Sequence, residues 1–281
     1  MNKVKIVADS TCDLNSGLLQ KYNIETIALP VNLGDKACLD GIDVHTPDLF
    51  AYYKKSGKLP TTSAPTPAYY EDFYRKWTEE GYDVVHFSIS AEMTVTPNIA
   101  KMAAENFPNV HPIDSRNVSS GMGILAVRAA ELRDEGLSAA EIEKQILAMR
   151  EKVRTSFVIS TLEYLHKGGR CTGIQALGAN LLNLKPCIEV QDGKMDVAKK
   201  YRGKLESVAL SMIQDKLGGD EEIDLSKLYI ACYDVPDDIL NSCKKKILSL
   251  RKFEDIEVNM TGCSVSVHCG PGTIGIIYMA K

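Results

Sequence analysis

The residues of this sequence best suited to binding a small anion are threonines and serines on rigid turns, whose hydroxyl groups can donate hydrogen bonds. The first such turn spans residues 59–67, where Thr62 and Ser63 stand among three prolines. Proline fixes its own φ and pushes the preceding residue into extended conformations, so these hydroxyls are presented on a rigid segment. Thr66 followed by Pro67 predicts the start of a helix through about residue 77, and a helix N-terminus attracts anions.

A second hydroxyl-rich turn follows the apolar run at residues 83–87. Ser90, Thr94 and Thr96 come soon after it, and Pro97 can open the next helix. Two strand-to-helix turns of this kind favour a carboxylate or phosphate site more than either turn does alone. The alternative that both are ordinary capped turns stays open, because Ser, Thr and Pro are common in such turns.

Two basic residues beside glycines are candidates to complete such a site. Arg170 follows Gly168 and Gly169, a pair that can form a tight turn with positive φ. The planar guanidinium of arginine suits a carboxylate. His268 lies at a predicted strand end, just before a glycine-rich turn. The open alternatives are a helix C-cap with a solvated arginine and a purely structural histidine.

Two enzyme classes can be weighed from the glycine and serine motifs. Gly270, Gly272 and Gly275 have the spacing of a dinucleotide fingerprint, but only six residues follow Gly275, too few for the helix and strand that this motif needs. The chain also has no Walker loop. An acyl-transfer hydrolase with a hydroxyl nucleophile and His268 as base is kept as the alternative function, although no G-x-S-x-G elbow supports it.

Apolar runs in the first half alternate with helical patterns. Residues 4–8, 25–31, 83–87 and 110–113 each predict a strand, and a capping box of Ser138 and Glu141 predicts a helix. We therefore expect a first α/β domain with a mainly parallel sheet at residues 1–153.

The second half adds antiparallel signals. Asp192 and Gly193 predict a hairpin turn, and residues 264–267 alternate like a strand. Residues 174–184 carry almost no charge and predict a helix that is buried or lines a pocket. A second α/β domain with a mixed sheet is expected at residues 154–281, and the 60–80 segment could pack on it.

Composition narrows the class of protein further. The 281 residues are 44% hydrophobic and 25% charged, with a net charge of -4, which gives no basic surface for nucleic acid. No apolar run is long enough for an integral membrane span, and no signal peptide is apparent, so we expect a cytoplasmic protein. Eight cysteines without a CxxC pair and five scattered histidines predict neither disulfides nor a metal site, but mostly buried thiols.

These motifs together resemble the DegV-like family of bacterial fatty-acid-binding proteins. The resemblance runs over nearly the whole chain and depends on the order of several short motifs: Asp9-Ser10-Thr11, Thr62-Ser63-Ala64-Pro65-Thr66-Pro67, the turn from Ser90 to Thr96, Ile113-Asp114-Ser115 with Gly121 and Gly123, Lys167-Gly168-Gly169-Arg170, Lys185-Pro186, and His268-Cys269-Gly270-Pro271-Gly272. The family resemblance implies two α/β domains with a ligand tunnel between them.

The resemblance also implies a ligand, a partner and a set of binding residues. The ligand would be a long-chain fatty acid such as palmitate or oleate, presented to a separate ATP-binding fatty acid kinase subunit that feeds phospholipid metabolism. The protein would be a lipid carrier without a catalytic residue, cofactor or metal of its own. The residues that match the family's ligand-binding positions are Thr62, Ser63, Thr94, Thr96, Arg170 and His268.

Two departures from the family pattern fall in the hydroxyl turns. Val95 replaces a glycine that the family commonly has between the residues matched by Thr94 and Thr96, and Ala64 stands where a glutamine is frequent. A valine at this position is expected to alter the local backbone and with it the direction of the two hydroxyls.

Overall fold

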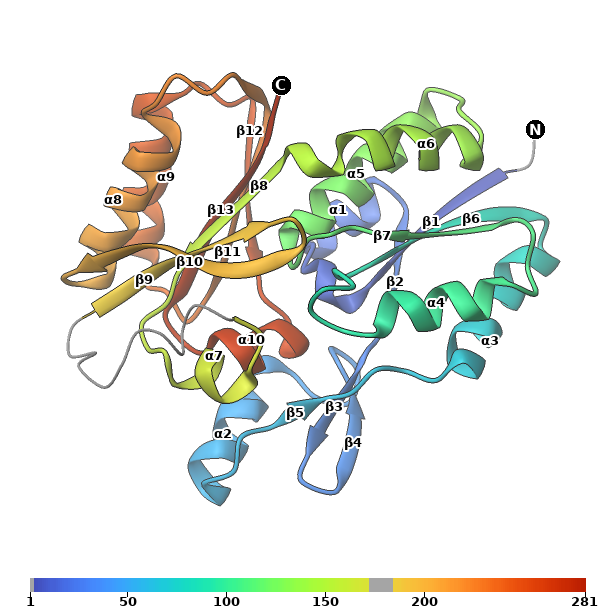
Figure 1. The fold of residues 1–281 in the computed structure, drawn as a ribbon, viewed down its shortest axis with the longest axis horizontal. Helices are drawn as coiled ribbons and strands as arrows, with labels where there is room; N and C mark the ends of the chain where they lie inside the picture. Colours follow the sequence, from blue (N-terminus) through green and yellow to red (C-terminus); the bar gives the residue numbers. More distant parts are fainter. Residues whose placement is uncertain (1–2, 172–183) are drawn as a thin grey trace.

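Three β-sheets organise the part of the chain that the computed structural model describes, residues 3–171 and 184–281 (Figure 1). The apolar helix predicted at residues 174–184 lies outside the described residues, except for Leu184, which begins a strand. The predicted class, an α/β protein with one parallel and one mixed sheet, is confirmed. The domain division at residue 153 stays a prediction.

The N-terminal half builds a parallel sheet with helices on both faces. Its strands, in spatial order, are β2 (Ile24–Ile27), β1 (Lys3–Asp9), β6 (Tyr82–Ser88) and β7 (Val110–Asp114). One face packs against α3 (Pro67–Glu79) and α4 (Thr96–Ala104), and the other against α1 (Ser16–Lys21), α5 (Ser120–Asp134) and α6 (Ala139–Met149). Because every strand is parallel, their carboxyl ends meet at one edge, where β1 leads into a short 3₁₀ helix, η1 (Ser10–Cys12).

The C-terminal half builds a mixed sheet. Its spatial order is β10 (Lys194–Arg202), β9 (Leu184–Gln191), β8 (Val153–Val158), β13 (Thr273–Ala280), β11 (Ile223–Tyr233) and β12 (Asp255–Met260), and only β11 with β12 is parallel. A second 3₁₀ helix, η2 (Arg150–Lys152), leads into β8. Two helices, α8 (Leu205–Leu217) and α9 (Asp237–Leu250), cover one face. Helix α5 packs on the other face, so it lies between the two larger sheets.

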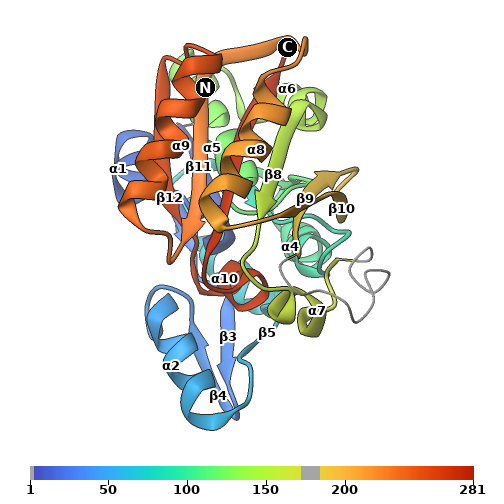
Figure 2. The same ribbon diagram turned by 90° about the vertical axis from the view of Figure 1, so that its left-hand side faces the viewer.

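A smaller lobe extends beyond the two larger sheets (Figure 2). It consists of α2 (Thr46–Ser56) and a three-stranded sheet of β4 (Lys36–Leu39), β3 (Pro30–Leu33) and β5 (Thr61–Thr62). Two short helices lie where this lobe joins the C-terminal half, α7 (Glu163–Gly168) and α10 (Cys263–Cys269). Phe50 of α2 stacks on Tyr233 and meets the edge of Tyr164.

Short-range signals in the sequence predicted several elements correctly. Thr66 caps α3 by accepting the N–H of Tyr69, with Pro67 as the first helical residue. Ser138 and Glu141 form the predicted capping box of α6. Asp192 and Gly193 have φ of 50° and 80°, as a primed hairpin turn between β9 and β10 requires.

Two strand predictions were wrong. Residues 25–31 are not one strand, because β2 ends at Ile27 and β3 begins at Pro30 in a different sheet. Residues 264–267 form part of helix α10 rather than a strand. All four of their side chains are buried, so the alternating sequence did not reflect one buried and one exposed face. Asp13 and Asp40, which are distant in the sequence, hold the start of this helix.

The prediction of mostly buried thiols is confirmed, since all eight cysteines lie in the described ranges and all are buried. Burial raises the pKa of the Cys269 thiol to about 12, so it carries no thiolate near neutral pH. Among the helices at residues 3–171 and 184–281, none is long and apolar enough to cross a membrane.

Candidate ligand-binding site

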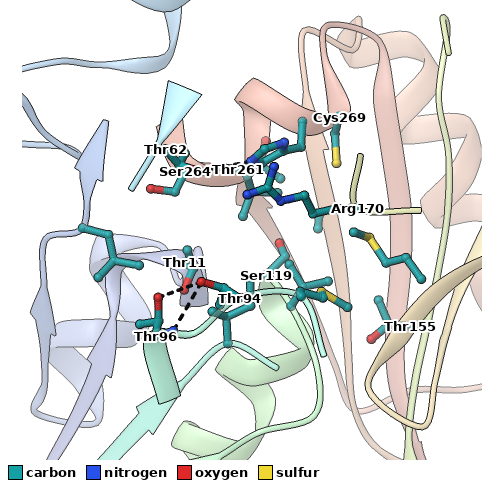
Figure 3. Close-up of a pocket in the computed structure, with 18 of the residues that line it drawn as sticks. Thr11, Thr62, Thr94, Thr96, Ser119, Thr155, Arg170, Thr261, Ser264 and Cys269 are labelled. Carbon is teal, nitrogen blue, oxygen red and sulfur yellow. Dashed lines mark hydrogen bonds between the residues drawn. The ribbon is translucent and has the colours of Figure 1, made fainter. Parts of the chain in front are cut away.

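A cavity of about 520 Å³ lies between the two larger sheets, and all six candidate residues line it. Figure 3 labels four of them, Thr62, Thr94, Thr96 and Arg170. Hydroxyls gather at one end of the cavity, including those of Thr11, Thr62, Thr94 and Thr96. The wall is largely apolar, and its residues come from many segments: Leu29, Ile89, Met93, Val118, Phe157, Met195, Ala231, Val265 and Ile277. The cavity therefore joins a polar end to an apolar wall.

Three paired residues of the six-stranded sheet line the cavity, and two of them are small. Phe157 of β8 pairs with Gly275 of β13, which pairs with Ala231 of β11. A Cβ at Gly275 would lie 2.7 Å from the Cβ of Phe157 and 2.9 Å from a backbone oxygen. Gly275, which lines the cavity, therefore permits the close packing of β8 on β13.

The first predicted turn reaches the cavity through β5. Thr62 Oγ1 lies 3.2 Å from His268 Nε2, so the hydroxyl loop and the C-terminal histidine meet although 206 residues separate them. Ser63 is exposed at the rim, where its Oγ accepts a long hydrogen bond of 3.4 Å from Asn32 Nδ2. Ala64 also lines the cavity.

The second predicted turn places two hydroxyls side by side. Thr94 Oγ1 lies 3.0 Å from Thr96 Oγ1, and the N–H of Thr96 donates to Thr94 Oγ1 at 3.3 Å. One hydroxyl proton is used between the two side chains, so the other is available to a ligand. Val95 has φ −80° and ψ −4°, ordinary values for valine, so the replacement of the family glycine does not strain this backbone.

The Lys167–Arg170 motif has a physical explanation at each glycine. A Cβ at Gly168 would lie 2.5 Å from His268 Nδ1, so this glycine lets α7 approach the imidazole. Gly169 has φ 66° and ends the helix in the left-handed region that glycine favours. The exposed Arg170 side chain turns back and donates from Nη1 to the Gly168 carbonyl oxygen at 2.5 Å, while it lines the cavity.

His268 is neutral at physiological pH. Burial, and to a smaller extent the nearby Arg170 charge, lower the pKa of His268 to about 4. Its Nδ1 is buried and has no hydrogen-bond partner among the described residues. An unpaired acceptor is less costly there than an unpaired N–H, which favours the tautomer in which Nε2 donates to Thr62 Oγ1. The hydroxyl proton of Thr62 is then free to donate into the cavity.

The sequence did not point to the apolar wall as part of the site. Met93, Phe157 and Met195 lie in segments that resemble ordinary core, and only the fold brings them to one cavity. Within residues 3–171 and 184–281 there is no cluster of side chains suited to a metal ion. What the site offers is hydroxyl donors and one guanidinium beside an apolar space.

Fold and site together define a class of protein: an α/β protein of two main sheets with a small-molecule pocket between them, polar at one end and apolar along its wall. Comparison with known proteins then identifies the family. A family model described as an uncharacterised protein of the DegV family matches residues 3–281. The chain belongs to the DegV family.

Individual relatives agree over the full length. A DegV domain-containing protein of Clostridium acetobutylicum is 35% identical over 286 residues, covering 100% of both chains. A DegV family protein from Thermus thermophilus, whose structure is described in terms of fatty acid binding, is 30% identical with a TM-score of 0.89 and full coverage of both chains. A stearic-acid-binding protein from Eubacterium ventriosum is 25% identical with a TM-score of 0.82, covering 100% of this chain and 99% of that one.

Proposed function

We propose that this protein binds one long-chain fatty acid, such as palmitate or oleate, in a tunnel between its two halves. The carboxylate would lie at the hydroxyl-rich end, near Thr62 and Thr94, and the acyl chain would follow the apolar wall. The observation that supports this most is the coincidence of both chemistries in one cavity. Its volume of about 520 Å³ falls in the usual range of small-molecule sites.

The energetics assign different tasks to the two ends of the ligand. Burying an acyl chain contributes about 0.8 kcal/mol per CH₂, which gives a gross driving force on the order of 10 kcal/mol before the chain's lost freedom is subtracted. A buried carboxylate is costly unless it is hydrogen-bonded. Hydroxyl donors from Thr62 and from the Thr94 and Thr96 pair would meet that requirement, with Ser63 at the rim and the Arg170 charge nearby.

We further propose that the bound carboxylate is presented to a separate ATP-binding fatty acid kinase subunit, in the cytoplasm. Arg170 is exposed while it lines the cavity, so its charge is within reach of a docked partner. The chain has no phosphate-binding Walker loop of its own, which is why the proposal needs a second protein. Arg170 would act as a fixed charge and His268 as a neutral hydrogen-bond donor.

The binding proposal can be tested on protein stripped of lipid. We expect palmitate and oleate to bind with saturation at one molecule per chain. Butyrate, which has the same carboxylate but almost no chain, should fail to compete at equal concentration. If palmitate does not bind, or if butyrate competes equally well, the cavity does not hold a long acyl chain.

The alternative of an acyl-transfer hydrolase has one observation in its favour, the hydroxyl of Thr62 beside the His268 imidazole. A general base of this kind is normally oriented by a third group, and His268 Nδ1 has no such partner in the described part of the chain. Incubation with a generic ester such as p-nitrophenyl butyrate separates the two functions. Turnover that is lost in Thr62→Val would favour the hydrolase over the carrier.

A further inference from the structure

The start of helix α10 is held by two buried carboxyl groups from the N-terminal half of the chain, those of Asp40 and Asp13. Asp40 accepts the N–H of Cys263 on Oδ1 at 2.9 Å and the N–H of Ser264 on Oδ2 at 3.0 Å. Asp13 Oδ1 accepts the N–H of Gly262 at 2.8 Å. The N–H groups at a helix start have no partner within the helix, so these three depend on residues far away in the sequence.

Both carboxylates are themselves fixed to the edge of the parallel sheet. Asp40 Oδ2 also accepts the hydroxyl of Ser10 at 3.1 Å, and the Ser10 oxygen accepts the N–H of Leu29 at 3.1 Å. Asp13 Oδ2 accepts the hydroxyl of Ser119 at 2.5 Å. The start of α10, in the C-terminal half, is therefore tied to η1 at the end of β1 and to the start of α5, both in the N-terminal half.

The other end of α10 carries His268. Seven helical residues span only about 10 Å, and so short a helix moves as one unit. Near the end of this unit, His268 meets Thr62 on one ring nitrogen and is closely approached by Gly168 on the other. A displacement at Cys263 would therefore be passed on to the imidazole at the polar end of the cavity.

We propose that Asp40, assisted by Asp13, is a positioning residue for the ligand headgroup. Through α10 it sets the place of the His268 imidazole against the Thr62 hydroxyl, and so the preference of the site for an acid over an uncharged ligand of equal length. Neither carboxylate is among the residues that line the cavity. The inference rests on the proposed function only for the identity of the ligand.

The test replaces Asp40 by asparagine. Asp40→Asn keeps the side-chain shape, but its NH₂ group cannot accept an N–H of α10. The pKa of His268, followed by NMR titration of ligand-free protein and assigned with a His268→Gln spectrum, should rise from about 4 toward 6.5 by at least about one unit, because the imidazole loses burial. The ratio of hexadecanol to palmitate dissociation constants should fall by about three- to fivefold, with hexadecanol affinity nearly unchanged.

Asp9→Asn is the matched control. Asp9 is also a buried carboxylate at the end of β1, but it accepts from Tyr70 and His86 and has no hydrogen bond to α10. It should lower the melting temperature without moving the His268 pKa or the ratio. If Asp40→Asn does not fold, Asp13→Ala, which removes the acceptor of the Gly262 N–H at the start of α10, carries the test with a rise of at least about half a unit.

The possible results divide cleanly. An unchanged His268 pKa in Asp40→Asn, or equal losses of palmitate and hexadecanol affinity, would overturn the positioning role and leave Asp40 a structural cap. If the unmutated protein binds neither ligand, the proposed function fails, but the His268 titration still decides the role of Asp40.

Discussion

Two imidazoles in this protein, that of the fully buried His86 and that of the partly buried His268, have opposite surroundings. His86, in the parallel sheet, has a partner on each nitrogen, with Nε2 3.0 Å from Asp9 Oδ1 and Nδ1 2.7 Å from the hydroxyl of Tyr74. His268 contacts Thr62 through Nε2, whereas its Nδ1 has no partner in the part of the chain described. His86 is enclosed by core, and His268 borders the cavity.

From this difference we propose that His86 serves stability and that His268 serves binding. A buried polar group whose hydrogen bonds are complete contributes rigidity and gains nothing from a ligand. A group left incomplete at the edge of a cavity can gain from one. The sequence predicts a strand over residues 83–87, which contains His86, and names His268 as a candidate site residue, and the contacts of the two imidazoles differ accordingly.

The largest effect on stability is expected at His86. His86→Ala would leave the Asp9 carboxylate and the Tyr74 hydroxyl without their shared partner, which should lower the free energy of unfolding by about 3 kcal/mol. Urea denaturation measures this loss. His111→Ala, which removes a partly exposed pair with Glu143, should cost less than about 1 kcal/mol. Equal costs for the two variants would contradict the assignment of His86 to stability.

The next largest effect is expected at the hydroxyls that line the cavity beside His268. Thr62→Val and Thr94→Val keep shape and remove a donor, so each should weaken palmitate binding by about 1 to 3 kcal/mol. Thr155→Val is the matched control, because Thr155 lines the same cavity but already donates its hydroxyl to Asn117 at 2.7 Å. Calorimetric titration measures the palmitate affinity of each variant. If both variants bind palmitate as tightly as the unmutated protein, neither threonine belongs to the site.

A smaller effect on affinity, but a clear one on transfer, is expected at the basic residues. Arg170→Ala and His268→Ala should keep palmitate affinity within about fivefold, because the acyl chain dominates binding. Acyl phosphate formation with ATP and the partner kinase subunit should fall at least about tenfold, since the phosphate adds charge beside these side chains. Both quantities are measured on the same preparations. If both variants support phosphorylation of the fatty acid at the unmutated rate, Arg170 is only a helix C-cap residue and His268 only a structural histidine.

The smallest effect is a pH dependence of stability. The pKa of His268 is lowered from 6.5 to about 4 in the folded protein, so the unfolded state takes up the proton first as pH falls. The contribution of the neutral His268 to stability is fully present above about pH 6.5 and is lost as the pH falls toward 4. The unmutated protein should lose at least about 1 kcal/mol more over this interval than His268→Gln. If the free energy of unfolding changed with pH in the same way in both proteins, burial would not lower the pKa of His268.

The sequence predicted those elements whose signals are local. The cap at Thr66, the capping box of Ser138 and Glu141, and the turn at Asp192 all depend on residues within a few positions of each other. Helix α10 was predicted as a strand because its start depends on Asp13 and Asp40, which no short window contains. The break between β2 and β3 likewise reflects a change of sheet at Pro30.

The candidate site divides in the same way. Thr62, Thr94 and Arg170 belong to short motifs with unusual composition, so they could be selected from the sequence, and the fold brings them to one cavity. Phe157 and Met195 could not be selected, because an apolar residue that faces a cavity has the same local sequence as one that faces core. Their role follows only from the packing of two sheets built from opposite halves of the chain.

Native mass spectrometry of the purified protein, before and after denaturation, tests the central claim most directly. The account predicts a complex heavier than the 30.9 kDa chain by one long-chain fatty acid, which is released and identified on denaturation. The bare chain mass in every spectrum, even after incubation of the protein with palmitate or oleate, would contradict it.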